Sequence, residues 1–255
     1  MIPDPWFYLA AVPAVLISGI SKGGFGAGLG IVAVPIMALV LPPVQVAAIM
    51  LPILCVMDLV GVWAYWKKWE PKILLHLSLA AVIGIAVGTL TFQVTEAWMI
   101  RLLIGVIALG FTANYLVKRL RRRQTTGFAP GRASGWLWGA VSGFTSFTAH
   151  AGGPPANVYL LPLGLPKTQY QATTVGLFLL VNYVKLVPYG ALGLFTLENL
   201  ATSAVLLPVA VAGILAGIWL HDRVPTGIFY TACYAFLALT GVKLIYDGLA
   251  GAGWV

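Results

Sequence analysis

Between two apolar runs the chain reads SKGGFGAGLG, at residues 21–30. Glycine weakens a helix by about 1 kcal/mol per residue relative to alanine, so five glycines within ten residues predict a break. The flanking runs, 6–20 and 31–41, are almost wholly apolar, as membrane segments are. In lipid, the backbone groups that a break releases are tolerated only where they face protein or water. The stretch therefore predicts a binding site inside a membrane-embedded protein.

The overall composition predicts an all-α polytopic membrane protein in contact with the lipid bilayer. Of 255 residues, 60% are hydrophobic and 9% are charged, and the mean hydropathy is +0.94. A soluble domain uses about 25% charged residues, so this chain has too few to cover a water-facing surface. The net charge of +8 is concentrated in a basic stretch near the middle of the chain. That pattern is typical of a cytoplasmic loop and excludes a nucleic-acid partner.

The apolar segments fall into two halves of similar order. Three segments of spanning length follow the first break, at 44–65, 73–92 and 97–117. The basic linker 118–133 then separates a first transmembrane repeat, 1–117, from a second, 134–255. In the second repeat a glycine and proline break divides 135–148 from 156–165, and spans are expected at 169–189, 197–220 and 226–247.

The two halves match without gaps over residues 18–60 when shifted by 124 residues. Asp58 then falls on Asn182, Gln45 on Gln169, and Gly28 on Gly152. We interpret the match as two homologous repeats, each with a glycine-broken or re-entrant helix pair plus three spanning helices. We expect the basic clusters to lie on the cytoplasmic side of the membrane. Each repeat then crosses the membrane an odd number of times. The two repeats are therefore expected to be inverted relative to each other, with both termini outside.

Two motifs carry a family resemblance. They are Gly19-Ile20-Ser21-Lys22-Gly23-Gly24-Phe25-Gly26 with Pro35, and Gly143-Phe144-Thr145-Ser146-Phe147-Thr148 with Gly152-Gly153-Pro154-Pro155. With the basic central loop, they make the chain resemble the TauE/SafE family of membrane transporters. The resemblance covers nearly the whole chain and implies transport of anions, typically sulfite, sulfoacetate or other organosulfonates, across a bacterial inner membrane.

The chemistry of the breaks also points to an anion. Half-helices starting near Gly28 and Pro154 would aim unpaired N–H groups and positive dipole ends at the break. Lys22 adds a full charge, although it could instead snorkel to the interface. The expected substrate-binding residues are Ser21, Lys22, Gly23, Gly24, Gly26, Gly28, Gln45, Thr145, Ser146, Thr148, His150, Gly152, Gly153 and Gln169. For Gln45 and Gln169, hydrogen bonding at a helix end is nearly as good an explanation as substrate contact.

Asp58, Asn182 and His150 are the candidates for coupling transport to a proton or another ion. Asp58 could carry the proton, and Asn182 keeps its hydrogen bonding without the charge; an interhelical hydrogen bond explains the pair about as well. His150 could titrate near neutral pH or simply bond to loop carbonyls. Lys185 and Arg101 lie near expected span ends, where a cation usually snorkels.

A secondary transporter working by alternating access is therefore the preferred interpretation. An anion channel is the first alternative, and an intramembrane hydrolase using His150 with Ser142 or Ser146 is the second. No hydrolase, metalloprotease or nucleotide-binding motif is present, so the protein is not expected to be an enzyme or to need a cofactor or metal. The sequence leaves open which anion is carried, the direction, the coupling ion and the oligomeric state.

Overall fold

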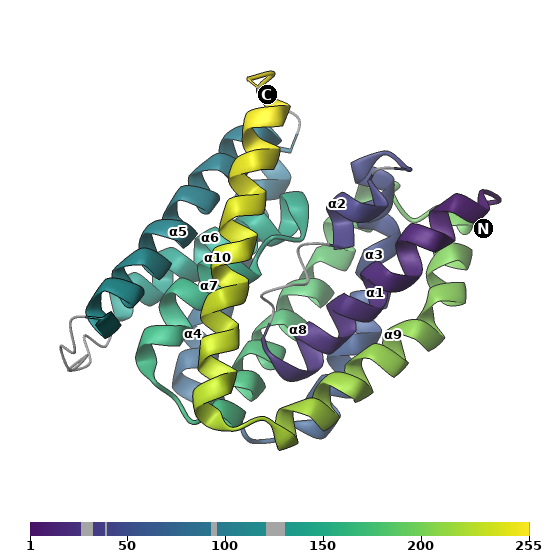
Figure 1. Ribbon diagram of the computed structural model, residues 1–255. Coiled ribbons are helices and arrows are strands. Elements are labelled where there is room, and N and C mark those ends of the chain that lie inside the picture. The colour runs from purple at the N-terminus through teal and green to yellow at the C-terminus, as the bar shows by residue number, and fades with distance from the viewer. Residues whose placement is uncertain (27–32, 39, 93–95, 121–130, 255) are drawn as a thin grey trace.

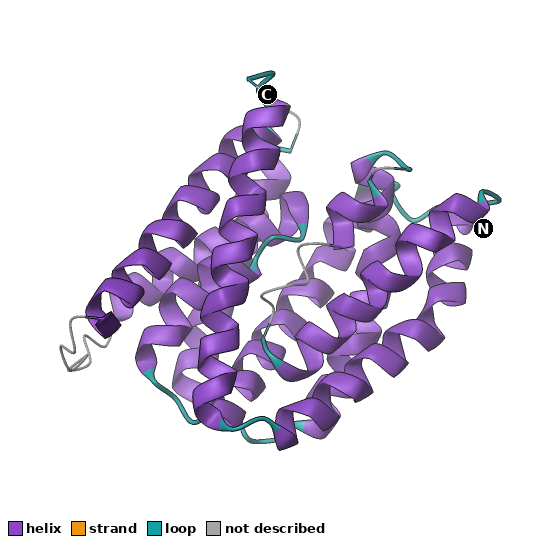
Figure 2. Cartoon of the chain, viewed as in Figure 1, coloured by secondary structure: helices purple, strands orange, loops and turns teal. Residues whose placement is uncertain are grey.

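The computed structural model describes residues 1–26, 33–38, 40–92, 96–120 and 131–254, and every regular element within these ranges is helical (Figure 2). The first half contains α1 (Pro5–Gly24), α2 (Ala33–Met37), α3 (Pro43–Ala64), α4 (Pro71–Leu90) and α5 (Ala97–Leu120). The second half contains α6 (Arg132–Ala149), α7 (Gly153–Leu160), the short 3-10 helix η2 (Leu161–Leu163), α8 (Lys167–Ala191), α9 (Leu197–Arg223) and α10 (Thr226–Gly251).

Among the described residues, six helices are long and apolar enough to cross a membrane: α1, α3, α4, α8, α9 and α10. The all-α polytopic class is thus confirmed. The central linker was predicted at 118–133. Helix α5 continues to Leu120 and α6 begins at Arg132, and residues 121–130 lie outside the described ranges.

Contacts between helix ends define one face of the molecule, which we call the terminal face. Both chain ends lie at this face (Figure 1). The backbone N–H of Ile2 donates to Thr202 Oγ1 near the start of α9, at 2.9 Å. Gln45, in the first turn of α3, donates through Nε2 to Asn199 Oδ1 at 3.1 Å. Helices α3 and α9 therefore both begin at the terminal face.

A second set of contacts defines the opposite face. Gln169, in the first turn of α8, donates through Nε2 to Glu70 Oε2 at 3.0 Å, just before α4 begins. Lys167 Nζ donates to the Val224 carbonyl oxygen at 2.7 Å, between α9 and α10. Helices α4, α8 and α10 therefore begin at this face. The first long helix after each break thus runs in opposite directions, α3 from the terminal face and α8 toward it.

The first break begins later than the sequence predicted. Helix α1 was expected to end near residue 20, but it continues through Lys22, Gly23 and Gly24. These glycines serve packing instead of interrupting the helix. A Cβ on Gly23 would lie 2.3 Å from the Ile214 carbonyl oxygen of α9, and one on Gly24 would lie 2.6 Å from that of Gly217. Two backbones can approach this closely only without side chains between them.

The second break lies where the sequence placed it, between the end of α6 and the start of α7. The residue after α6, His150, has a left-handed backbone with φ of 49°, which turns the chain. Helix α7 then begins at Gly153 and has a proline in its first turn, where a missing N–H costs nothing. Helix α6 packs on α4 as tightly as α1 packs on α9: a Cβ on Gly143 would lie 2.0 Å from the Ala81 carbonyl oxygen.

Candidate functional site

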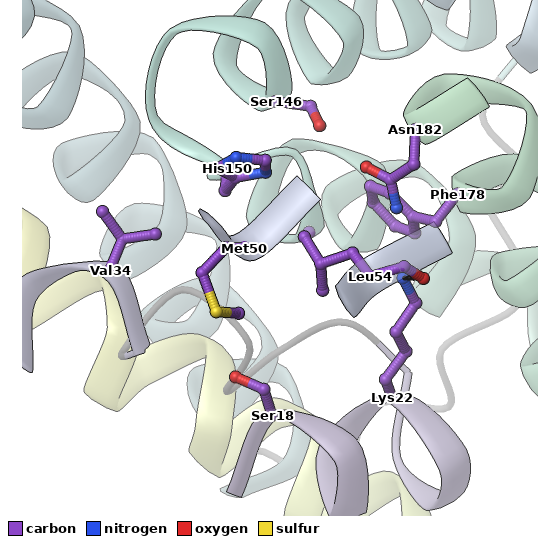
Figure 3. A pocket seen from close by; sticks show the side chains of 10 residues that line it. Ser18, Lys22, Val34, Met50, Leu54, Ser146, His150, Phe178 and Asn182 are labelled. Atoms are coloured by element: carbon purple, nitrogen blue, oxygen red, sulfur yellow. Dashed lines mark hydrogen bonds between the residues drawn. The ribbon is translucent and has the colours of Figure 1, made fainter. Parts of the chain in front are cut away.

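A small cavity lies between the two halves, beside both breaks (Figure 3). Its volume is about 40 Å³, whereas a single water molecule needs about 10–15 Å³ of such a cavity. Six helices, α1, α2, α3, α6, α7 and α8, and the turn after α6 contribute to its lining. The lining residues are Ser18, Lys22, Val34, Met50, Leu54, Ser146, His150, Gly153, Phe178 and Asn182.

Lys22 borders this cavity as half of a buried ion pair. Its Nζ lies 2.7 Å from Asp58 Oδ1 on α3, and it also donates to the Leu54 carbonyl oxygen at 3.3 Å. Lys22 is 7% exposed and Asp58 is 0% exposed. Asn182 Nδ2 on α8 donates to the second carboxylate oxygen, Asp58 Oδ2, at 2.7 Å. The Asp58 carboxylate is therefore held from both halves of the chain, and the charge of Lys22 is balanced within the protein.

A second lysine, Lys185 of α8, lies on the other side of the cavity wall and is fully buried. Its Nζ donates to the Ser146 carbonyl oxygen at 3.1 Å and to Ser146 Oγ at 3.0 Å. It also lies 3.0 Å from His150 Nδ1. The expectation that Lys185 snorkels to the interface is therefore wrong. Both groups that Lys185 contacts, Ser146 and His150, line the cavity directly.

The contacts of His150 fix which ring nitrogen carries its proton. Nε2 lies 3.1 Å from the Ala47 carbonyl oxygen, which can only accept, so Nε2 is the donor. A neutral ring then leaves Nδ1 as an acceptor, which suits the ammonium of Lys185. Both ring nitrogens are thus engaged by groups other than a serine hydroxyl. The arrangement does not form the serine and base pair that a hydrolase requires.

A larger cavity of about 270 Å³ lies toward the terminal face. Val34 lines both cavities. Pro43 and Val44, at the start of α3, place the second cavity near the terminal face, and Arg101 of α5 contributes a cation to its wall. The wall of the larger cavity therefore carries a positive charge on the terminal side of the small cavity.

The opposite side of the site is filled by hydrogen-bonded side chains. Gln171 of α8 donates through Nε2 to the Lys22 carbonyl oxygen and accepts through Oε1 from the Gly26 N–H, both at 2.6 Å. Tyr65 donates to the Gly23 carbonyl oxygen at 2.7 Å, and His221 Nδ1 lies 3.0 Å from that of Gly24. These contacts cap the last carbonyls of α1, which have no partner within the helix.

The structure brings part of the predicted site together. Five of the predicted residues line the small cavity: Lys22, Ser146, His150, Gly153 and Asn182. Asp58 joins them through its ion pair with Lys22. Gly152 lies directly behind the cavity, where its carbonyl oxygen accepts from Ser142 Oγ at 2.8 Å. Gly28 lies outside the described residues.

Other predicted residues are placed differently. Ser21 donates to the Gly26 carbonyl oxygen at 3.1 Å. Thr145 donates to the Val141 carbonyl oxygen at 2.8 Å, and Thr148 lies 3.2 Å from that of Phe144. These hydroxyls therefore point to backbone acceptors in this conformation. Gly23 and Gly24 pack on α9, as described above.

Gln45 lies at the terminal face, bonded to Asn199 near the start of α9. Gln169 lies at the opposite face, bonded to Glu70 just before α4. The structure thus places them at helix ends and not beside the small cavity.

Sequence reasoning missed Lys185, and a signal for it exists. Asn182, Lys185 and Tyr189 are three and four residues apart along α8, so they share one face of the helix. Asn182 was already a site candidate, and Tyr189 donates to the Phe147 carbonyl oxygen at 3.0 Å, beside the second break. A lysine between two polar residues on one helix face indicates an inward-facing cation.

Residues 11–244 match the model of the family described as sulfite exporter TauE/SafE. The chain belongs to the TauE/SafE family. The matched region contains every residue that lines the small cavity. Neither the curated proteins nor the solved structures that were searched contain a match to this chain. Family membership and the six spanning helices make the protein a multi-pass membrane protein of a transporter family, not of an enzyme family.

Within the described residues, no group of three or more His, Cys, Asp or Glu side chains is arranged to hold a metal ion. The polar chemistry of the site is supplied by ammonium, imidazole, carboxylate, hydroxyl and amide groups. Of these groups, the ammonium, hydroxyl and amide groups can donate hydrogen bonds to a small anion.

Proposed function

We propose that this TauE/SafE protein is a secondary transporter of small anions such as sulfite, sulfoacetate or another organosulfonate, with its substrate site in the cavity between the halves. One observation carries the proposal. Two buried lysines and only one carboxylate surround this cavity within the described part of the chain: Lys22 and Lys185 against Asp58. A buried charge is costly unless it is paired. An anion bound in the cavity would complete the pairing.

The size of the cavity favours a compact anion over a bulky one. A single water molecule needs about 10–15 Å³ of such a cavity, so at about 40 Å³ it admits a solute of only a few heavy atoms. Sulfite, with three oxygens on one sulfur, is closer to this limit than sulfoacetate, which carries a second charged group. Sulfite is therefore the first substrate to test, and the larger organosulfonates would require the site to widen.

Alternating access is supported by hydrogen bonds that pair the two halves. The halves align at an offset of 124 residues, and four helix-break contacts follow the same offset. Tyr65 donates to the Gly23 carbonyl oxygen, and its counterpart Tyr189 donates to that of Phe147. Such matched contacts are expected of inverted repeats, in which each copy closes one side of a shared site.

A second matched pair joins the halves to each other. In one contact, Gln171 accepts a hydrogen bond from the Gly26 N–H. The 124-residue offset relates Gly26 to His150 and Gln171 to Ala47. In the matching contact, His150 donates to the Ala47 carbonyl oxygen. The contact between Gln171 and Gly26 lies on the side of the site away from the termini, which hydrogen-bonded side chains fill. On the terminal face, Ala47 borders the larger cavity. The structure is then one of two access states, and the other would arise when the halves exchange their conformations.

We also propose that Asp58, Asn182 and His150 couple transport to a proton or another ion. Protonation of Asp58 would remove the partner of Lys22 and change the charge of the site by one unit. Asn182 would hold the carboxyl group in place in both protonation states, because an amide can donate to either form.

The test is counterflow in liposomes that contain the purified protein. We expect internal unlabelled sulfite to accelerate uptake of external labelled sulfite, because a carrier returns faster when loaded. Uptake that does not respond to internal sulfite would indicate an anion channel instead. Absence of any sulfite, sulfoacetate or taurine flux would overturn the proposal. A product of hydrolysis that disappears in a His150→Ala variant would favour the hydrolase.

A further inference from the structure

We propose that Lys185, and not Lys22, is the cation whose charge the transported oxyanion neutralises, acting through the Ser146 hydroxyl at the cavity wall. The inference rests on the proposed function and names the residue that supplies the charge. It rests on the unequal pairing of the two buried lysines.

Lys22 already has a full counter-charge. Its Nζ lies 2.7 Å from Asp58 Oδ1, and the same carboxylate is held by Asn182. The attraction of a second anion to Lys22 would be opposed by the Asp58 carboxylate. The Lys22–Asp58 pair is neutral as a unit and contributes little net attraction for a substrate.

Lys185 has no carboxylate partner. Of the described residues, only Lys22 and Lys243 form ion pairs with an acid. The three acceptors around Lys185 Nζ are the Ser146 carbonyl oxygen, Ser146 Oγ and His150 Nδ1. Three acceptors match the three protons of an ammonium group. The group is therefore arranged as a cation, yet its neighbours offer only partial negative charge.

The carbonyl that Lys185 contacts lies in the last turn of α6, which ends at Ala149. A helix C-terminus carries roughly half a negative charge, so it offsets part of the ammonium charge and leaves the rest. Lys185 could thus be only a helix cap. The positions of its other two partners argue for more, because both Ser146 and His150 face the cavity (Figure 3).

Ser146 is arranged to transmit the charge. Its Oγ accepts from Lys185 Nζ at 3.0 Å, which leaves the hydroxyl proton for an acceptor in the cavity. A hydroxyl polarised by an ammonium is a stronger donor than an isolated one. At the 124-residue offset, Ser146 is also the counterpart of Lys22. In the second half the cation therefore comes from α8 and reaches the cavity through a serine.

The experiment compares sulfite binding by calorimetry and sulfite counterflow among purified full-length variants. Lys185→Gln removes the charge, Lys185→Arg keeps it, and the double variant Lys22→Met/Asp58→Asn removes the neutral pair together. We expect Lys185→Gln to raise the sulfite Kd by about 10-fold or more, as loss of a hydrogen bond from a charged group does. The arginine variant should recover at least half of this loss on a logarithmic scale. The double variant should raise the Kd by less than Lys185→Gln does, because it leaves the net charge around the cavity unchanged.

A helix cap without a role in binding predicts a different pattern. In that case Lys185→Gln would lower the melting temperature and leave the Kd of the folded fraction unchanged, which would overturn the inference. A double variant that loses as much affinity as Lys185→Gln would also overturn it, and would assign the charge to Lys22. If Lys185→Gln does not fold, Ser146→Ala replaces it. We expect Ser146→Ala to weaken sulfite binding more than the double variant does, and an unchanged Kd for Ser146→Ala would reject the inference. Failure of the wild-type protein to bind or exchange sulfite would instead reject the proposed function.

Discussion

Asn182 donates a hydrogen bond of 2.7 Å to Asp58, and the two residues are 124 positions apart in the chain. This is the offset at which the two halves align. The proposed inverted repeats would place such a contact near the axis that relates the two copies. The contact therefore marks the place where α3 and α8 meet in the centre of the molecule, next to the cavity and its two lysines.

The Asp58 carboxylate is expected to be required for stability as well as for coupling. Asp58→Asn would leave the buried Lys22 without its counter-charge, and removing one partner of such a pair costs about 3–5 kcal/mol. Replacing both partners, as in Lys22→Met/Asp58→Asn, should restore most of that loss. Thermal unfolding of the purified variants measures both effects. Equal melting temperatures for the single and double variants would show that the ion pair does not hold these helices together.

The glycine seam between α4 and α6 is expected to tolerate no side chain. A Cβ at Gly143 would lie 2.0 Å from the Ala81 carbonyl oxygen, so Gly143→Ala must push two backbones apart. Overpacking of this kind costs about 1–3 kcal/mol or more. Gly110→Ala is the matched control, because nothing lies within 4 Å of a Cβ there. Expression and melting temperature should fall for Gly143→Ala only, and a loss of similar size in the control would contradict the packing argument.

The sequence predicted the two helix breaks because glycine and proline leave a local signal. It placed the first break too early, since a glycine can also serve close helix packing. Gly23 and Gly24 have that second role, which depends on α9 lying alongside α1. Local propensity could not distinguish the two uses of glycine.

The site was predictable where a charge or ring lies beside a break, as Lys22 and His150 do. Lys185 was missed because a lysine six residues before the end of a helix usually reaches the interface. Its burial follows from packing of α8 against the end of α6, which no local pattern specifies. Thr145 and Thr148 were expected to donate into the site, but helical threonine readily bonds to the carbonyl four residues earlier.

The orientation in the membrane can be tested with reporters. Lys167 and Glu70 lie at the face opposite the termini, which also carries the basic residues Lys67 and Lys68. Positive residues favour the cytoplasmic side, so both termini are expected outside. In bacterial cells, a reporter active only outside the cytoplasm should work when fused after residue 255. A reporter inserted in the linker 121–130 should require the cytoplasm, and the reverse pattern would contradict the proposed orientation.

Arg101 is expected to attract anions into the larger cavity from the terminal face. It lines this cavity and is not one of the basic residues found in an ion pair within the described residues. Arg101→Gln should lower sulfite uptake at low ionic strength by about 3- to 10-fold, and the difference should shrink in high salt because salt screens exposed charges. Lys167→Gln is the control, since Lys167 lies at the opposite face and donates to the Val224 carbonyl oxygen. A salt-independent loss would indicate a structural role for Arg101.

Alternating access predicts that two matched positions differ in their exposure to water. Val44, in the first turn of α3, is 47% exposed and borders the larger cavity. Its counterpart Thr168, in the first turn of α8, lies on the filled side, 3.3 Å from His221 Nε2. With Cys55 and Cys233 replaced by alanine, Val44→Cys should react with a thiol reagent that cannot cross the membrane, applied at the terminal face. Thr168→Cys should be protected from reagent at its own face until sulfite drives the exchange of states. Equal reaction at both positions, with no response to sulfite, would favour a continuous channel over a carrier, because a channel opens to both sides at once.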